Sequence, residues 1–153
     1  MKDKSSFSVE TPSESPGFLL WQVTTLWQRK IKTALQPLGL SHSGFVILAS
    51  LLWFREHETD VTQTAIIGHT KLDKMTVSKS LKKLHAEGLV LRAENETDTR
   101  AKTITLTDTG AALAAEAVGI VEKTDRRFFE TLTPGEAEQL NDLFIRLRDG
   151  KET

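Results

Sequence analysis

The sequence predicts a mainly α-helical fold with one small β-hairpin, and three observations lead to this fold class. Apolar residues recur at spacings of three and four along most of the 153 residues, as in helices with one buried face. Residues 89–94 and 101–106 instead alternate apolar with polar side chains, which is the period of a β-strand. Ser, Thr or Asp stands before most helical segments, where its side chain can cap the helix. The expected order is four helices, a hairpin and two further helices.

The composition restricts the class of protein. With 39% hydrophobic residues the chain can bury one core, so we expect a single domain over residues 17–153 behind a flexible tail over residues 1–16. The lack of cysteine rules out disulfides and thiolate chemistry and favours a reducing, cytoplasmic location. The first residues lack the apolar stretch of a signal peptide, and no segment approaches the roughly 20 apolar residues of a membrane span, so no membrane partner is expected.

Residues 17–36 are predicted to form the first helix, which Pro37 and Gly39 end. Its helical stripe consists of Leu19, Val23, Leu26, Trp27, Ile31, Ala34 and Leu35. The apolar arc also includes Leu20 and Trp21, which makes it wider than one core contact requires. A second chain is the simplest partner for the additional surface, so this segment is predicted to be a dimerisation helix.

Ser41 and Ser43 can cap the second helix, and Thr62 can cap a short third helix that Gly68 is expected to close. The predicted buried face of the second helix is Phe45, Val46, Leu48, Ala49, Leu52 and Trp53.

The fourth predicted helix, residues 73–87, begins at an Asp73 cap and stops at Gly88. Its two faces at about 100° per residue are Val77, Leu81 and Leu84 on one side and Met75, Lys79, Lys82, Lys83 and Ala86 on the other. With the short helix before it, this segment has the proportions of a helix-turn-helix. Lysines on one face suit DNA phosphates, and Thr76 and Ser78 near the helix start can reach base edges. The alternative is that the lysines form only a solvated face.

The hairpin favours DNA binding over a merely solvated lysine face. Its apolar residues alternate with polar ones, so each strand should turn one face to the core: Leu89 and Leu91, then Ile104 and Leu106. The polar tip can carry Arg100 into the minor groove, with Asp98 orienting the guanidinium, or the two can form an ordinary exposed ion pair. Residues 71–102 hold eight basic and five acidic side chains, whereas the whole chain carries a net charge of −1. Residues 41–107 are therefore predicted to be a winged helix-turn-helix, with the hairpin as its wing.

Two helices are predicted to follow the wing over residues 108–148. Thr107 and Asp108 can start a long Ala-rich helix, in which small residues such as Gly119 allow another helix to approach closely. One face of this helix holds Leu113, Ala117, Ile120, Val121 and Phe128. Thr133, Pro134 and Glu136 form a capping box that begins the last helix. Its residues expected to face inward are Leu140, Leu143, Phe144 and Leu147.

These motifs resemble the MarR family of bacterial transcriptional regulators over about residues 17–148. The segment MTVSKSLKKLHAEGLVLR is similar to the family's recognition helix, with a frame of Ser78, Leu84 and Gly88. The most specific match is the wing motif D-x-R-A, residues 98–101, which runs into LTDTG, residues 106–110. The segment LGLSHSGFVILASL is similar to the family's second helix, and the first, fifth and sixth helices match its dimerisation elements. Lys79 departs from the arginine that the family often has there, and lysine cannot contact guanine in a bidentate way.

The resemblance implies a homodimer on a pseudo-palindromic operator, with two recognition helices in successive major grooves roughly 34 Å apart. The predicted DNA contacts are Thr62, Gln63, Lys74, Thr76, Ser78, Lys79, Lys82, Lys83, Asp98 and Arg100. The resemblance also implies that a small aromatic or amphipathic effector binds between the dimerisation and DNA-binding parts and releases the protein from DNA. The residues offered there are Trp21, Thr25, Trp27, His42, Phe45 and Trp53, for which plain packing is the alternative.

The predicted function is thus a DNA-binding regulator, a homodimeric repressor released by an effector. The alternative is a winged-helix module that binds a protein partner and has no specific DNA site. An enzyme is not expected, because the four histidines show no closely spaced ligand pair and no phosphate loop or nucleophile elbow appears. His42 with Glu56 or Asp108 offers only a weak metal site, so neither metal nor cofactor is expected.

Overall fold

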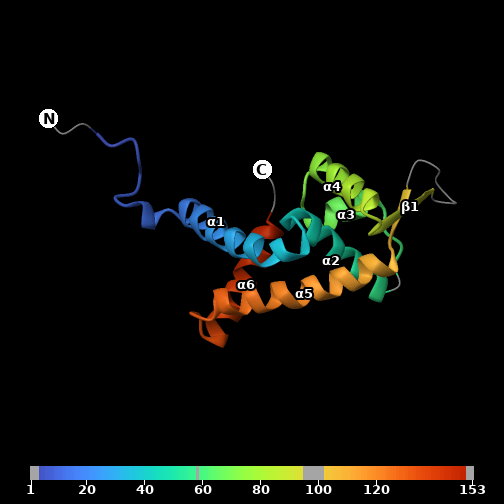
Figure 1. Ribbon diagram of the computed structural model, residues 1–153. Helices are drawn as coiled ribbons and strands as arrows, with labels where there is room; N and C mark the ends of the chain where they lie inside the picture. Colours follow the sequence, from blue (N-terminus) through green and yellow to red (C-terminus); the bar gives the residue numbers. More distant parts are fainter. Residues whose placement is uncertain (1–3, 58, 95–101, 151–153) are drawn as a thin grey trace.

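The computed structural model describes residues 4–57, 59–94 and 102–150 (Figure 1). Its elements, in chain order, are α1 (Pro16–Leu35), α2 (His42–Glu56), α3 (Gln63–Thr70), α4 (Lys74–Ala86), β1 (Val90–Glu94), β2 (Lys102–Leu106), α5 (Asp108–Phe129) and α6 (Pro134–Arg148). Turns of 3-10 helix stand at Pro12–Glu14 and Gln36–Leu38. This order confirms the predicted fold class of four helices, a hairpin and two further helices.

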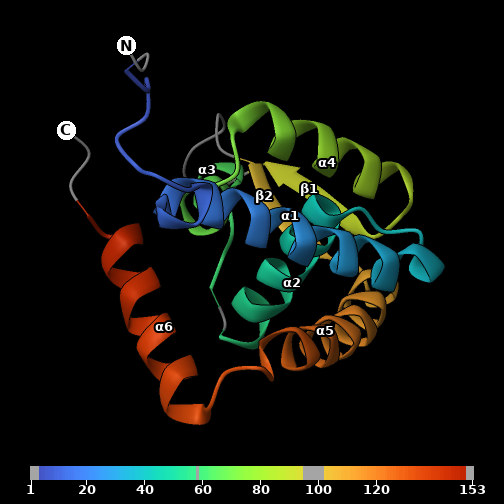
Figure 2. The ribbon, with the colours of Figure 1, turned by 90° about the vertical axis from the view of Figure 1, so that its left-hand side faces the viewer.

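The central helix of the fold is α2, which contacts α1, α3, α4, α5 and β2. Figure 2 shows α5 below α2, with α3, α4 and the hairpin above it and α1 running in front of it. The largest fully buried side chains come from these elements and form one core: Ile31, Leu35, Ile47, Leu48, Ile66, Val77, Leu81, Val90 and Ile104. The recognition-helix region and the long helix α5 are therefore packed on the same central helix.

The predicted helix starts are confirmed by side-chain caps. Ser41 Oγ accepts a hydrogen bond from Gly44 N at 3.0 Å, and Thr62 Oγ1 accepts one from Ala65 N at 3.1 Å. Thr133 forms the expected capping box at the start of α6, because its hydroxyl accepts from the Glu136 N–H while Glu136 accepts from the Thr133 N–H. Each cap satisfies backbone N–H groups that have no partner within the helix.

The predicted end of α3 at Gly68 is wrong, because the helix continues to Thr70. The chain leaves the helix at Lys71, which has a φ of 62° and whose N–H still donates to Ile67 O at 3.0 Å. A glycine inside a helix costs only about 1 kcal/mol relative to alanine, so its presence alone does not end a helix.

The predicted inward face of the first strand is also wrong by one residue. Val90 pairs with Leu106 and Arg92 with Ile104, so Val90 is buried whereas Leu91 is 55% exposed. Leu89 is buried as expected, but it belongs to the turn that ends α4, where its N–H donates to Leu84 O at 2.9 Å. The alternation of the strand therefore starts at Val90, and a shift of one residue exchanges the two faces.

A further pairing joins the start of α3 to the wing. Ile104 N donates to Val61 O at 2.7 Å, and Thr62 forms an antiparallel bridge with Thr103. The sequence did not predict this contact, because it joins residues about forty positions apart without a local signal.

The predicted helix faces are confirmed only in part. In α2, Ile47 and Leu51 enter the core, whereas Trp53 is exposed. In α1 the predicted stripe is buried only at Ile31 and Leu35. In α5 the buried residues are Gly110, Ala114, Ala117 and Val121. The expectation that Leu143, Phe144 and Leu147 point inward is wrong for the single chain, because these side chains are exposed.

The two ends of the chain contain little buried surface. No residue between 4 and 15 is buried, and the flexibility of this segment stays a prediction. Among the described residues, no single helix is long and apolar enough to cross a membrane. Only α1, its following turn and α2 taken together reach that length and apolar composition, and they are bent by 76°.

Candidate nucleic-acid interface

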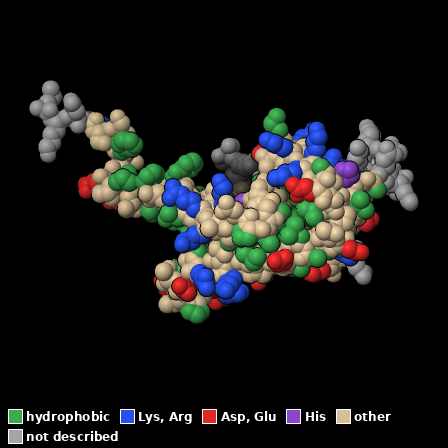
Figure 3. All heavy atoms as spheres, in the orientation of Figure 1, with side chains coloured by type: hydrophobic (Ala, Val, Ile, Leu, Met, Phe, Trp, Pro, Cys, Tyr) green, Lys and Arg blue, Asp and Glu red, His purple; other side chains and the backbone are tan. Residues whose placement is uncertain are grey.

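Helix α4 separates its apolar and cationic side chains as predicted. Val77, Leu81 and Leu84 are buried against the core. The opposite face is solvent-exposed and carries Met75, Ser78, Lys79, Lys82 and Lys83. Figure 3 shows Lys and Arg side chains gathered over this helix. A helix that buries one face and presents lysines on the other is suited to lie against the phosphates that border a DNA groove.

The start of α4 is fixed by Asp73. Its carboxylate accepts hydrogen bonds from Thr76 N and from Thr76 Oγ1, both at 2.8 Å. These bonds, the backbone one first, lower the pKa of the Asp73 carboxyl below its usual value. Because the Thr76 hydroxyl proton is donated to Asp73, Thr76 can meet a base edge only as an acceptor. Ser78 is exposed one turn into the helix, and Lys74 is exposed at the first helical position.

The remaining predicted DNA contacts differ in how the structure places them. Thr62 caps α3 and pairs with β2, so its hydroxyl already has a structural role, and Gln63 is the partly exposed first residue of α3. Asp98 and Arg100 lie outside the described residues, so their entry into the minor groove stays a prediction. The strands that lead to them pair in register up to Glu94 and Lys102.

A cleft of about 430 Å³ lies between the start of α2 and the basic side of α4. It is lined by Gly39, Leu40, Ser41, Ser43, Gly44, Thr76, Lys79, Ser80, Lys83, Leu84 and Glu87. The Ser43 and Ser80 hydroxyls lie 3.4 Å apart and join the two helices. Hydroxyls beside ammonium groups are the donors that phosphate oxygens accept from, so this cleft extends the cationic face of α4 towards α2. Ser43 and Ser80 were not among the predicted DNA contacts. The only sequence signal for Ser80 was its place directly after Lys79.

Three of the predicted effector residues meet where α1, α2 and α5 join. The Trp27 and His42 rings stand edge to face with centroids 5.0 Å apart, and Phe45 is buried on the next turn of α2. Trp27 Nε1 also donates to Asp125 Oδ1 at 2.8 Å, a partner that the sequence did not predict. Burial lowers the pKa of His42 below 6.5, and the nearby charge of Asp125 opposes this shift.

The other three predicted effector residues, Trp21, Thr25 and Trp53, lie apart from this junction. Trp21 is 71% exposed on the first half of α1, where its carbonyl accepts from Thr25 Oγ1 at 2.7 Å. Trp53 is 54% exposed near the end of α2 and stacks on His57 with centroids 3.9 Å apart. The proposed metal ligand Asp108 instead lies 3.7 Å from Arg55, and within the described part of the chain no group of three or more His, Asp or Glu side chains is placed to hold a metal ion.

The fold and this basic helix define a winged helix-turn-helix protein of the class that binds DNA. A family model described as the ArnR1-like winged-helix domain matches residues 37–124. The uncharacterized HTH-type transcriptional regulator YdcH of Bacillus subtilis is 39% identical over 118 residues, which are 77% of this chain and 80% of that protein. A transcriptional regulator of the MarR family from Rhodococcus sp. RHA1 is 25% identical and superposes with a TM-score of 0.81 over 95% of this chain and all of that one. The chain belongs to this family of winged helix-turn-helix transcriptional regulators.

Two further comparisons agree with this family. The HTH-type transcriptional repressor Rv2887 of Mycobacterium tuberculosis is 28% identical over 131 residues, which are 86% of this chain and 91% of that protein. The structure of BpsR from Bordetella bronchiseptica superposes with a TM-score of 0.84 at 24% identity, covering 94% of this chain and all of that one. DNA binding of BpsR is regulated by 6-hydroxynicotinic acid. At this identity the superposition shows the shared fold.

Proposed function

We propose that the chain acts in the cytoplasm as a homodimeric repressor of transcription that binds a pseudo-palindromic operator and is released by a small aromatic or amphipathic effector. The observation that carries this proposal is the cationic face of α4, which is exposed opposite a fully packed apolar face. In this arrangement α4 lies in the major groove, its lysines meet phosphates, and the wing tip reaches the adjacent minor groove. Ser78 is the best-placed described side chain for a direct base contact.

Exposed apolar surface on α1 and α6 supports the homodimer. The exposed large side chains of α1 are Phe18, Leu19, Leu20, Trp21, Val23 and Leu26. Those of α6 are Leu143, Phe144, Ile145 and Leu147, and no residue of α6, all of which the structure describes, is buried. Large apolar side chains exposed along a helix are typical of an interface, and two copies related by a two-fold axis can cover them reciprocally.

The junction of α1, α2 and α5 supports the effector. Trp27 and His42 are partly exposed and offer aromatic surface there, and His42 and Asp125 offer polar groups that can orient a ligand. The junction joins two helices proposed for dimerisation, α1 and α5, to α2, which also contacts the helix proposed for DNA. Trp21 lies on the apolar surface of α1 that the proposed dimer covers. The effector regulation of BpsR offers a parallel for such a response in the same fold.

The proposal is tested by selecting duplexes with the protein from a random-sequence pool and measuring affinity for the selected and for scrambled duplexes at several salt concentrations. A repressor of this kind should show sequence preference, an inverted repeat in the selected sequence, and affinity that falls steeply with salt. A module that binds only proteins would give no sequence-specific, salt-sensitive binding. A ligand panel of aromatic acids, followed by tryptophan fluorescence and operator affinity, tests the effector separately.

A further inference from the structure

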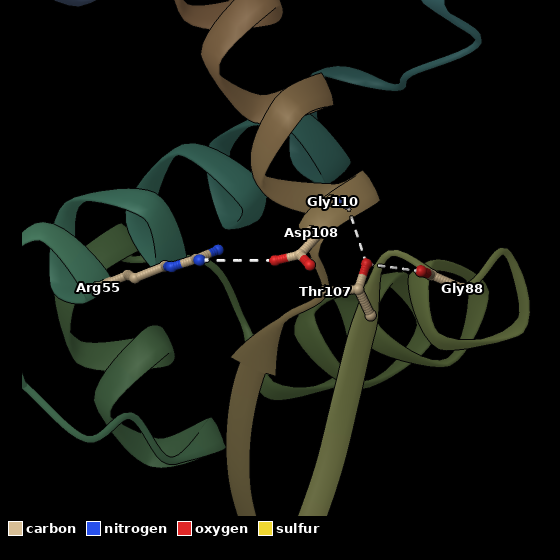
Figure 4. A network of polar contacts seen from close by, with 5 residues as sticks. All are labelled: Arg55, Gly88, Thr107, Asp108 and Gly110. Carbon is tan, nitrogen blue, oxygen red and sulfur yellow. Dashed lines mark hydrogen bonds and ion pairs between the residues drawn. The ribbon is translucent and has the colours of Figure 1, made fainter.

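The segment LTDTG, residues 106–110, joins the wing to helix α5, and its Thr107 bonds in two directions (Figure 4). Thr107 Oγ1 accepts a hydrogen bond from Gly110 N at 3.0 Å, which caps α5. The same hydroxyl donates to Gly88 O at 2.7 Å, and Thr107 N donates to Leu89 O at 3.1 Å. Gly88 and Leu89 form the turn that ends α4. One residue therefore ties the start of α5 to the end of the helix proposed to read DNA.

Gly110 brings the backbone of α5 into direct contact with this turn. A Cβ atom at Gly110 would stand 1.9 Å from Leu89 O and 2.9 Å from Leu89 C, so only glycine fits there without a shift of the backbone. The turn is itself bonded into α4, because Leu89 N donates to Leu84 O at 2.9 Å and Gly88, at a φ of 74°, takes a left-handed conformation. A continuous set of backbone contacts thus runs from α5 into the last turn of α4.

The nearby ion pair does not account for this link. Arg55 Nη2 of α2 lies 3.7 Å from Asp108 Oδ1, and both side chains are largely exposed, so solvent screens the pair. Figure 4 shows this pair on one side of Thr107 and the Gly88 bond on the other. The connection between the start of α5 and the end of α4 therefore consists of the bonds from the Thr107 hydroxyl and N–H and of the close approach that the missing side chain of Gly110 allows.

We propose that Thr107 and Gly110 are positioning residues for DNA recognition, which lock the end of α4 to α5 so that the direction of the recognition helix follows the dimerisation helix. The inference rests on the proposed function, in which a dimer presents two α4 helices to two half-sites. A loose joint leaves each α4 free to reorient, so base contacts and half-site spacing are read less strictly. Phosphate contacts tolerate such reorientation, so affinity for any DNA depends on the joint much less.

The substitution Thr107→Asp separates the two roles of this residue. An aspartate keeps the acceptor that caps α5, but an ionised carboxylate has no proton to donate to Gly88 O. Thr107→Ser keeps both bonds and serves as the rescue variant. Thr133→Asp is the matched control, because Thr133 caps α6 in the same way through bonds that stay within its own helix. Thr107→Val, which removes the hydroxyl at constant shape, replaces Thr107→Asp if that variant does not fold.

The first measurement needs no DNA. Amide hydrogen exchange over residues 84–90 reports the opening of the turn that Thr107 holds. Thr107→Asp should speed exchange there by about two- to tenfold, the change expected from one lost hydrogen bond, whereas Thr107→Ser and Thr133→Asp should match the parent. Parental exchange in Thr107→Asp would show that the hydroxyl does not fix the end of α4, and would overturn the proposal.

The second measurement compares affinity for a duplex selected by the parent protein, for the same duplex with one base pair added between half-sites, and for a scrambled duplex. In Thr107→Asp the preference for the selected duplex should fall by about two- to tenfold, while scrambled binding and its salt slope stay parental. An unchanged preference would refute positioning by Thr107. If the parent itself had no sequence preference, the proposed function and the positioning role would both fail, and hydrogen exchange would still decide whether the lock exists.

Discussion

Substituting Gly110 by alanine should destabilise the fold strongly, although alanine is the better helix former. The added Cβ would stand 1.9 Å from Leu89 O, whereas ordinary contacts between such atoms begin at about 3.4 Å. To relieve this overlap, the start of α5 must move away from the turn by more than roughly 1 Å, because a backbone carbonyl cannot rotate aside as a flexible side chain can. That movement stretches the two bonds that Thr107 makes to Gly88 and Leu89.

The magnitude follows from three terms. Overpacking costs about 1–3 kcal/mol, two weakened hydrogen bonds cost about 1 kcal/mol each, and the helix propensity of alanine returns up to about 1 kcal/mol. The free energy of unfolding should therefore fall by about 2–4 kcal/mol. For a chain of this length the melting temperature should fall by roughly 5–15 °C.

Gly68→Ala is the control for this measurement. Gly68 lies inside α3 and a Cβ there meets nothing within 4 Å, so the same substitution should raise stability by up to about 1 kcal/mol. Both variants are compared with the parent by urea unfolding and thermal melting at one protein concentration, because the stability of a dimer depends on concentration. The reasoning is refuted if Gly110→Ala is as stable as the parent, or more stable.

Three further outcomes are expected. Lys82→Ala should weaken binding to selected and scrambled duplexes alike and flatten the salt slope by about one unit, whereas Lys123→Ala on α5 should do neither, as measured by fluorescence anisotropy. Burial lowers the pKa of His42 in the folded chain, although the charge of Asp125 opposes this shift, so as the pH falls the unfolded chain binds a proton at His42 first. The free energy of unfolding should therefore be highest above pH 6.5 and fall as the pH drops towards the pKa of folded His42. Urea unfolding of His42→Gln should lack this decrease. Sedimentation should show a parent dimer at micromolar concentration and a monomer for Leu143→Glu, and a folded parent monomer would contradict the dimer.

The parts of the fold that the sequence predicted are those determined by neighbours in the chain. The caps at Asp73 and Thr133 bond to residues three positions later in the same helix, so the residue type and its spacing carry the whole signal. The opposed faces of α4 were predicted for the same reason, because helical geometry alone separates Val77 from Lys79 and Lys82. The basic face of the candidate interface was therefore predictable without the tertiary structure.

Contacts between distant segments were not predictable in this way. The bond from Ile104 to Val61 and the hydrogen bond from Trp27 to Asp125 join elements far apart in the chain, and no spacing rule connects their members. The inward face of the first strand was mispredicted because the turn that ends α4 includes Leu89. The Thr107 hydroxyl belongs to both classes: its cap on α5 is a local signal, whereas its bond to Gly88 appears only when the wing folds back.

The wrong inward face of α6 and the exposed part of the α1 stripe have a common physical reason. Periodicity indicates that a helix face is covered, but it does not say by which molecule. The apolar residues left exposed lie on the first half of α1 and along α6, whereas the buried side of α5, from Gly110 to Val121, is covered by its own chain. Helix α5 is therefore fixed to the core and, through Thr107, to α4, while the first half of α1 and the length of α6 leave large apolar side chains exposed. If the dimer forms through these exposed surfaces, any change in its geometry reaches α4 through α5, since that helix has the direct bond to the end of α4.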